Sequence, residues 1–323
     1  MKLKYMRLTT PLLIPCMLMA SMLLTASCRK EKAPEPSNLD VNHFVIADNP
    51  NDPIDHAIYE FYKNTGIASY CTDTIYKQKI SRENESPARY KYITLSLEYT
   101  PLSDFYVNTI PLSSRQRIPG LLNLLQTEVV PKLPSTKIFP SILFLDSFAT
   151  YINSDIQISH GWSSLQGFNT LGVMAKDVEP MNAAERKMYA ASILAGIADK
   201  RLTDMMSTRL QKEFFSISRE AAKNLFPYDV DIYFGWPFLF LVPPGSEPPP
   251  TELGFIYYPT FYLGGMPVPN MLRETDDTRS FLAASFYYTE QEFTTLHAND
   301  PLVLKKFGII RSFAKEAGFK IPE

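Results

Sequence analysis

The sequence predicts an α+β protein in which strands dominate the first half of the chain and helices the second. Two observations, one from each half of the chain, predict this fold class. Short apolar runs of strand character, such as Ser141–Leu145, occur mainly before the middle of the chain. Longer stretches with apolar residues at i, i+3 and i+4, such as Pro301–Gly318, occur mainly after it. Between them lies Met181–Leu202, which is apolar on every side and therefore predicted to be the central buried helix.

Before the central helix, the pattern alternates between helical and extended segments. Residues Asp55–Tyr62 have helical apolar spacing, and Gly66 is a natural C-terminal stop. A second helix is predicted over Ser113–Val130, with Pro119 near its start and Pro131 after its end. The predicted strands are Ile67–Tyr76, Tyr92–Tyr99, Ser141–Leu145 and Asn169–Ala175.

The central helix has a clear start signal. Asn182 is a good N-cap, and Glu185 follows three residues later, which is the spacing of a capping box. No charged residue occurs from Met188 to Ala198. We therefore expect Tyr189, Ile193 and Ile197, which share one stripe of this helix, to be buried.

After the central helix, aromatic loops interrupt the helices. Gly254–Pro269 is too rich in Gly, Pro and aromatic residues to form one regular element, and Pro243–Pro250 is predicted to be an extended loop. The predicted helices are Leu210–Phe226, in one or two pieces, Arg279–Tyr288 and Pro301–Gly318.

The N-terminus carries the most specific motif of the chain. Lys2, Lys4 and Arg7 precede an apolar stretch, Leu8–Leu24, which leads into Thr25-Ala26-Ser27-Cys28. This order resembles a bacterial lipoprotein signal peptide, which implies cleavage before Cys28 and attachment of lipid, palmitate included, at that residue. The predicted organisation is a signal peptide over 1–27, a lipidated cysteine and flexible tether over 28–40, and one domain over 41–323.

Composition excludes several classes of function. Loss of Lys2, Lys4 and Arg7 with the signal peptide would take the net charge from −2 to −5, and no basic patch for nucleic acid is visible. Cleavage would also remove Cys16, so that Cys71 would be the only free thiol and no internal disulfide could form.

The order of the elements resembles a known family. The chain resembles the zincin-like metallopeptidase lipoproteins found beside outer-membrane glycan-import systems of Gram-negative bacteria. The similar segments are His56–Tyr76, Phe139–Leu145, Gly254–Pro259, and Phe281–Ala284 followed by Lys305–Phe313. The resemblance implies a zincin-like fold, a lipid anchor in the outer membrane, import proteins as partners, and a glycan or peptide as ligand. In this family the buried helix carries H-E-x-x-H, whose two His bind zinc and whose Glu acts as general base.

The chain departs from the family at the positions that hold the metal. The motif aligns with Ser192–Gly196, so that Ser192 and Gly196 replace the two His and Ile193 replaces the Glu. The later acidic ligand aligns near Arg279–Ala284, which contains no acid. We therefore expect a degenerate member with no cofactor, no metal ligand and no catalytic residue carried over, and hence a non-catalytic protein.

Other candidate metal-binding or catalytic residues give weaker signals. No pair among His43, His56, His160 and His297 has the spacing of metal ligands. Ser163 lies near His160 in His-Gly-Trp-Ser-Ser, which permits a nucleophile hypothesis but lacks G-x-S-x-G. Glu274, Asp276 and Asp277 could bind calcium, although their spacing is more typical of a solvated turn.

Three functions are compatible with these observations: a binding or accessory lipoprotein of a nutrient import system, a hydrolase that uses Ser163 or the Glu274–Asp277 cluster, and a structural subunit without a ligand. A surviving cleft would lie between Asn169–Ala175, the central helix and Gly254–Pro269, where Gly196 would leave space and Ile193 would fill it. The candidate ligand-binding residues there are Tyr257, Tyr258 and Tyr262, because aromatic side chains on a loop can stack on a sugar or a peptide.

Overall fold

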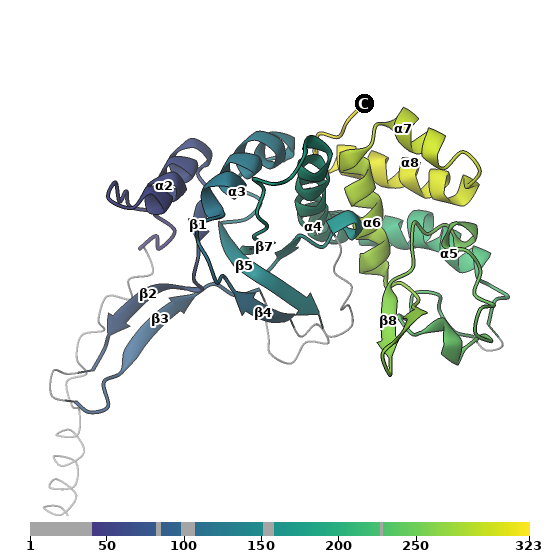
Figure 1. Ribbon diagram of the computed structural model, residues 1–323, viewed down its shortest axis with the longest axis horizontal. Helices are drawn as coiled ribbons and strands as arrows, with labels where there is room; N and C mark the ends of the chain where they lie inside the picture. The colour runs from purple at the N-terminus through teal and green to yellow at the C-terminus, as the bar shows by residue number, and fades with distance from the viewer. Residues whose placement is uncertain (1–40, 82–84, 98–106, 151–157, 227–228) are drawn as a thin grey trace, which may run out of the picture. The chain divides into compact units, whose positions relative to one another are not determined.

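The computed structural model describes residues 41–81, 85–97, 107–150, 158–226 and 229–323. Within these ranges the chain contains both helices and strands, with one five-stranded sheet and two separate hairpins (Figure 1). The predicted α+β class is confirmed. Cys28 and the predicted signal peptide and tether lie outside the described residues.

The first described helix, α2 (Pro53–Thr65), begins and ends where the sequence predicts. Asp52 caps it by accepting hydrogen bonds from the backbone N–H groups of Ile54 and Asp55, at 2.8 and 3.1 Å. Gly66 ends it with a φ of +75°, a left-handed conformation that favours glycine.

Strand β5 (Ser141–Thr150) is the centre of the sheet. Its first half pairs in parallel with β1 (Ala68–Tyr70) and β7 (Leu171–Met174), and its second half pairs antiparallel with β4 (Val107–Pro111). Strand β6 (Ser164–Gln166) pairs antiparallel with β7 and completes the sheet. The predicted run Ser141–Leu145 is therefore the doubly paired half of a longer strand, which explains why it is continuously apolar.

Two predicted elements differ in detail. The predicted strand Ile67–Tyr76 is two strands, since a turn separates β1 from β2 (Thr74–Lys79), which forms a hairpin with β3 (Tyr90–Thr94). The second helix, α3 (Ile118–Leu124), continues as a π-helical turn over Leu125–Val129.

The second half of the described chain is mainly helical. Helix α4 (Ala183–Arg209) is the predicted central helix, and both bonds of its capping box form between Asn182 and Glu185, at 2.8 and 3.0 Å. None of the helices in the described ranges is long and apolar enough to cross a membrane. After α4 come a π-helical segment at Leu210–Phe215, α5 (Ser216–Ala221), β8 (Thr260–Leu263), β9 (Met266–Pro269), α6 (Glu274–Tyr287), α7 (Glu290–Leu296) and α8 (Pro301–Glu316). Short 3-10 helices lie at Val130–Lys132, Ile158–His160, Phe238–Phe240 and Pro250–Leu253.

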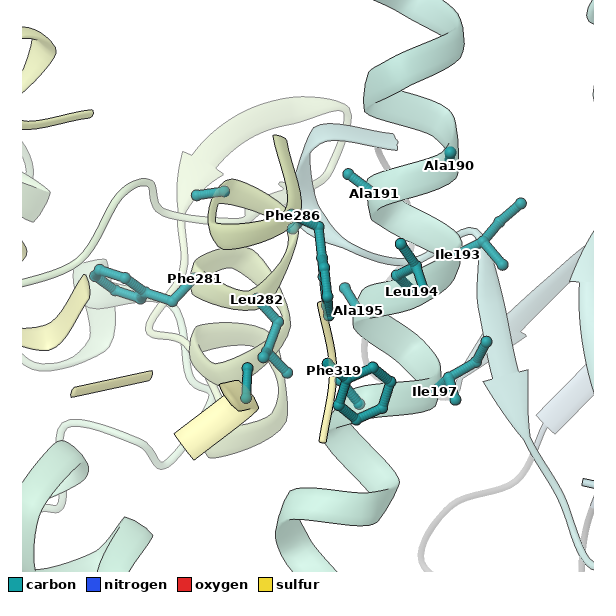
Figure 2. Close-up of a cluster of buried hydrophobic side chains, with 14 of the residues drawn as sticks. Ala190, Ala191, Ile193, Leu194, Ala195, Ile197, Phe281, Leu282, Phe286 and Phe319 are labelled. Carbon is teal, nitrogen blue, oxygen red and sulfur yellow. The ribbon is translucent and has the colours of Figure 1, made fainter. Parts of the chain in front are cut away.

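Helix α4 is buried on opposite sides. Figure 2 shows Ile193 and Ile197 pointing toward the strands, whereas Leu282 and Phe286 of α6 lie between the two helices. Tyr189, on the same stripe as the two isoleucines, donates its hydroxyl hydrogen to the carbonyl of Met174 in β7. The prediction of a buried Tyr189–Ile193–Ile197 stripe is confirmed, because all three side chains are inaccessible to solvent.

Candidate functional site

The residues that align with the metal motif pack directly against strand β6 and the segment before it. The Ser192 hydroxyl donates to Ser163 Oγ at 2.7 Å and accepts from the Ser163 backbone N–H at 3.1 Å. One turn later, Gly196 lies so close to Ser164 that an added Cβ would be 2.4 Å from both the carbonyl oxygen and Oγ of Ser164. Glycine at 196 therefore permits close packing, and the prediction that it leaves open space is wrong.

Residues His160–Ser164 form a wedge between α4 and α6, and we refer to them as the wedge segment. Gly161 has a φ of +80°, and an added Cβ would be 2.5 Å from the carbonyl oxygen of Arg279. The Trp162 indole N–H donates to Asp276 Oδ1 at 3.1 Å, and the Arg279 guanidinium lies 4.0 Å from the centre of the Trp162 ring. The wedge segment thus contacts both helices that would border a zincin metal site.

A buried ion pair joins α4 to α6 at the same level. Arg279 Nε donates to Asp199 Oδ2 at 3.0 Å, and Arg279 Nη1 donates to the carbonyl of Ser164 at 2.9 Å. Burial raises the pKa of Asp199, and the neighbouring Arg279 charge opposes that effect. Arg279 lies where the family resemblance places an acidic ligand. The guanidinium group of Arg279, held by Asp199 and Ser164, therefore occupies that part of the interior.

These residues do not fit zinc. Zinc in proteins takes Cys, His, Asp or Glu ligands at about 2 Å, and the aligned positions hold a serine that is bonded to Ser163 and a glycine that is packed against Ser164. Within the described ranges no three His, Cys, Asp or Glu side chains come together in a way that could hold a metal ion. No step of a zinc-dependent reaction can be derived from this arrangement.

The four histidines lie apart, each beside a different neighbour. His56 Nδ1 is 2.8 Å from Asp48, His297 Nδ1 is 2.9 Å from Asp300, and the His43 ring lies beside Tyr76. The His160 ring stacks on Tyr257 with ring centres 3.4 Å apart. Ser163, the candidate nucleophile, is fully buried and bonded to Ser192, so the geometry does not support the hydrolase that was hypothesised on it.

The acidic cluster at the start of α6 is divided among separate partners. Glu274 contacts Arg219 and Gln211, at 2.5 and 2.8 Å, whereas Asp276 accepts from Trp162 and Asp277 from Lys306. Asp276 and Asp277 are buried, so the expectation of a solvated turn is wrong for both. Their carboxylates are used by protein donors and do not converge on a shared point.

Lys306 is fully buried, which sequence reasoning missed. Its ammonium group contacts Asp277 Oδ2 at 2.5 Å and the Ser218 hydroxyl at 2.9 Å, while Tyr233 donates to the same carboxylate oxygen at 2.6 Å. The ammonium also lies 4.5–5.0 Å from the ring centres of Phe214, Phe255 and Phe281. Burial lowers the pKa of Lys306 to about 8, although the Asp277 carboxylate opposes this shift.

The three candidate tyrosines do not form one platform. Tyr257 stacks on the wedge segment through His160, and Tyr258 donates its hydroxyl hydrogen to the Pro248 carbonyl at 3.0 Å. Tyr258 also packs on Phe238, so both residues are half-buried parts of the fold. Tyr262 is 62% exposed on β8 and alone among the three offers most of its surface to a ligand.

Further exposed aromatic side chains lie at Phe261, on the other face of β8 from Tyr262, and in a segment joined to the outer edge of β9. The segment 234–240 is joined to the end of β9 by the Pro237–Asn270 bridge and by a hydrogen bond from the Met271 N–H to the Trp236 carbonyl at 2.9 Å. From residue 224 to residue 272 the sequence contains no Lys, Arg or His. We call the following set the aromatic surface: Phe234, Trp236, Phe240, Phe261 and Tyr262, each of which is more than a third exposed.

We compared the chain with known proteins in three ways. No protein-family model, curated protein or solved structure matches it. The resemblance to zincin-like lipoproteins therefore stays a prediction, which rests on the segments quoted from the sequence.

Proposed function

We propose that this protein is a non-catalytic, lipid-anchored binding or accessory component of a nutrient import system at the outer membrane, built on a metallopeptidase-like fold. The packing of Ser192 and Gly196 against Ser163 and Ser164 is the observation that carries this proposal. It supports the absence of catalysis because the positions for metal and general base are occupied by close-packed protein atoms.

A binding role is supported by the aromatic surface. Exposed aromatic side chains occur on segment 234–240 and on β8, and exposed aromatic side chains are typical of recognition surfaces. A glycan or a peptide is the class of ligand that this surface would accept.

The binding role is tested on arrays of glycans and peptides. We expect binding to fall about tenfold or more when Phe234 and Trp236 are both changed to Ala, since their rings lie 4.6 Å apart edge to face and each would lose its contact with the ligand. Leu296→Ala is the matched control, because Leu296 is equally exposed but lies on α7. Absence of binding, or equal binding by the double variant, would support the structural-subunit alternative.

The lipid anchor is tested separately. Replacing Cys28 with Ala removes the thiol that the signal sequence marks for lipidation, so we expect the variant to lose incorporation of labelled fatty acid and to leave the membrane fraction. Cys71→Ser is the control, because Cys71 belongs to the described domain. Undiminished labelling of the Cys28 variant would refute the anchor.

A further inference from the structure

The hairpin of β8 and β9 has one edge that cannot pair with another strand and one that can. The register pairs Phe261 with Val268 and Leu263 with Met266, and the Asn270 N–H donates to the Pro259 carbonyl at 2.8 Å in the same register. Because hydrogen-bonded and non-hydrogen-bonded pairs alternate along an antiparallel ladder, the pairs that contain Thr260 and Tyr262 are the non-hydrogen-bonded ones. The backbone groups of Thr260 and Tyr262 therefore point away from β9.

On β9, the same alternation turns Pro267, Pro269 and Met271 outward. The two prolines have no N–H to donate, and the Met271 N–H is already bonded to the Trp236 carbonyl. The outer edge of β9 is thus closed to a further strand. The outer edge of β8 keeps the N–H and C=O groups of Thr260 and Tyr262, and no backbone hydrogen bond in the described part of the chain takes them.

The other hairpin of the protein shows how an exposed edge is normally protected. Strands β2 and β3 carry Lys77, Lys79 and Lys91, and charged lysines on an edge disfavour pairing with another chain. Strand β8, with the sequence Thr-Phe-Tyr-Leu, has no charge and no proline, and its Phe, Tyr and Leu are all exposed.

The charges around β8 indicate what kind of strand would pair with it. Burial raises the pKa of the Tyr258 hydroxyl, two residues before β8, and the nearby carboxylates of Glu247 and Glu252 raise it further. An acidic strand would be repelled there. An uncharged, apolar strand with basic flanks complements both the side chains of β8 and the acids at its base.

We propose that the outer edge of β8 binds an extended segment of a partner protein as a third strand, and that this segment is apolar with basic residues at its ends. This inference rests on the proposed binding function and assigns its partner class. Backbone pairing through Thr260 and Tyr262 gives affinity, and the exposed side chains of Phe261 and Tyr262, on opposite faces of β8, contact side chains of the incoming strand.

The test uses full-length protein in detergent and immobilised twelve-residue peptides with a core of alternating Val and Thr. We expect the peptide with lysines at both ends to bind more tightly than the one with glutamates, and a proline in the middle of the core to abolish binding. Binding should slow hydrogen exchange at the amides of Thr260 and Tyr262. A peptide that binds without slowing exchange at these two amides would overturn the proposal.

Two substitutions at one position separate backbone pairing from side-chain stacking. Tyr262→Pro removes the ring and also the outward N–H, which Pro267 and Pro269 already lack on β9, and should weaken peptide binding about tenfold or more. Tyr262→Ala keeps that N–H and should cost about fivefold or less. If Tyr262→Ala is the more harmful change, or if only glycans bind, strand pairing is refuted while the proposed binding function stands. A dimer that Tyr262→Pro dissociates would instead assign the edge to a second copy of the chain and would likewise refute the partner strand.

Discussion

Replacing Asp277 with Asn is expected to lower the free energy of unfolding by about 3–5 kcal/mol, because it leaves the charge of Lys306 buried without its counterion. Lys306 and Asp277 are both completely inaccessible to solvent, so water cannot compensate for the lost carboxylate. The measurement is urea unfolding of the purified protein. Glu316→Gln is the control, since it breaks a half-exposed pair with Arg209 and should cost about 1 kcal/mol or less.

The stability lost in Asp277→Asn should depend on pH. In the native protein burial lowers the pKa of Lys306 to about 8 from its ordinary value of 10.5. Between these values the unfolded chain binds more protons, so this group makes the free energy of unfolding rise with pH across that window. In Asp277→Asn the lysine loses its proton at lower pH, and the deficit relative to the native protein should therefore shrink as the pH rises toward about 8. A deficit no larger than that of Glu316→Gln would contradict the assignment of a buried ion pair.

Replacing Gly196 with Ala is expected to destabilise the protein by about 1–3 kcal/mol or more, although alanine favours a helix. The added methyl group would lie 2.4 Å from two oxygen atoms of Ser164, so either α4 or the wedge segment must move. Gly308→Ala is the matched control in α8, where an added Cβ meets nothing within 4 Å.

The two variants should change stability in opposite directions. Gly308→Ala should stabilise the protein by roughly 0.5–1 kcal/mol, because it removes backbone freedom from the unfolded chain. The comparison is made by thermal or urea unfolding of both proteins under the same conditions. If Gly196→Ala were also stabilising, there would be room beside α4, and the interpretation of a closed interior would fail.

Sequence reasoning located the elements whose local pattern determines them. Helix α4 was predicted from its capping box and its uncharged middle, and α2 from Gly66. The short strand β6 was missed because Ser164–Gln166 is too short to show a period, and its position depends on pairing with β7. Helix α7 was also missed, since Glu290–Leu296 contains one fully buried side chain, Phe293, and so lacks a stripe.

The candidate site was harder to predict because its features depend on contacts between distant segments. The replacement of the metal motif by Ser192, Ile193 and Gly196 could be found from spacing alone. The close packing of Gly196 against Ser164 could not be found in this way, because a glycine is compatible with either an empty space or a close approach of another segment. The buried ion pairs join Arg279 to Asp199, 80 positions away, and Lys306 to Asp277, 29 positions away. Hydrophobic periodicity gives no information on contacts at such separations.

The central claim is that this domain binds no zinc and catalyses no reaction at the positions of the metal motif. The most direct test is the metal content of the purified protein after incubation with zinc and dialysis. Because the aligned positions hold a bonded serine and a packed glycine, we predict that no stoichiometric zinc is retained. Peptide cleavage that a chelator abolishes and zinc restores should likewise be absent. One zinc ion retained per chain, together with such cleavage, would contradict the account.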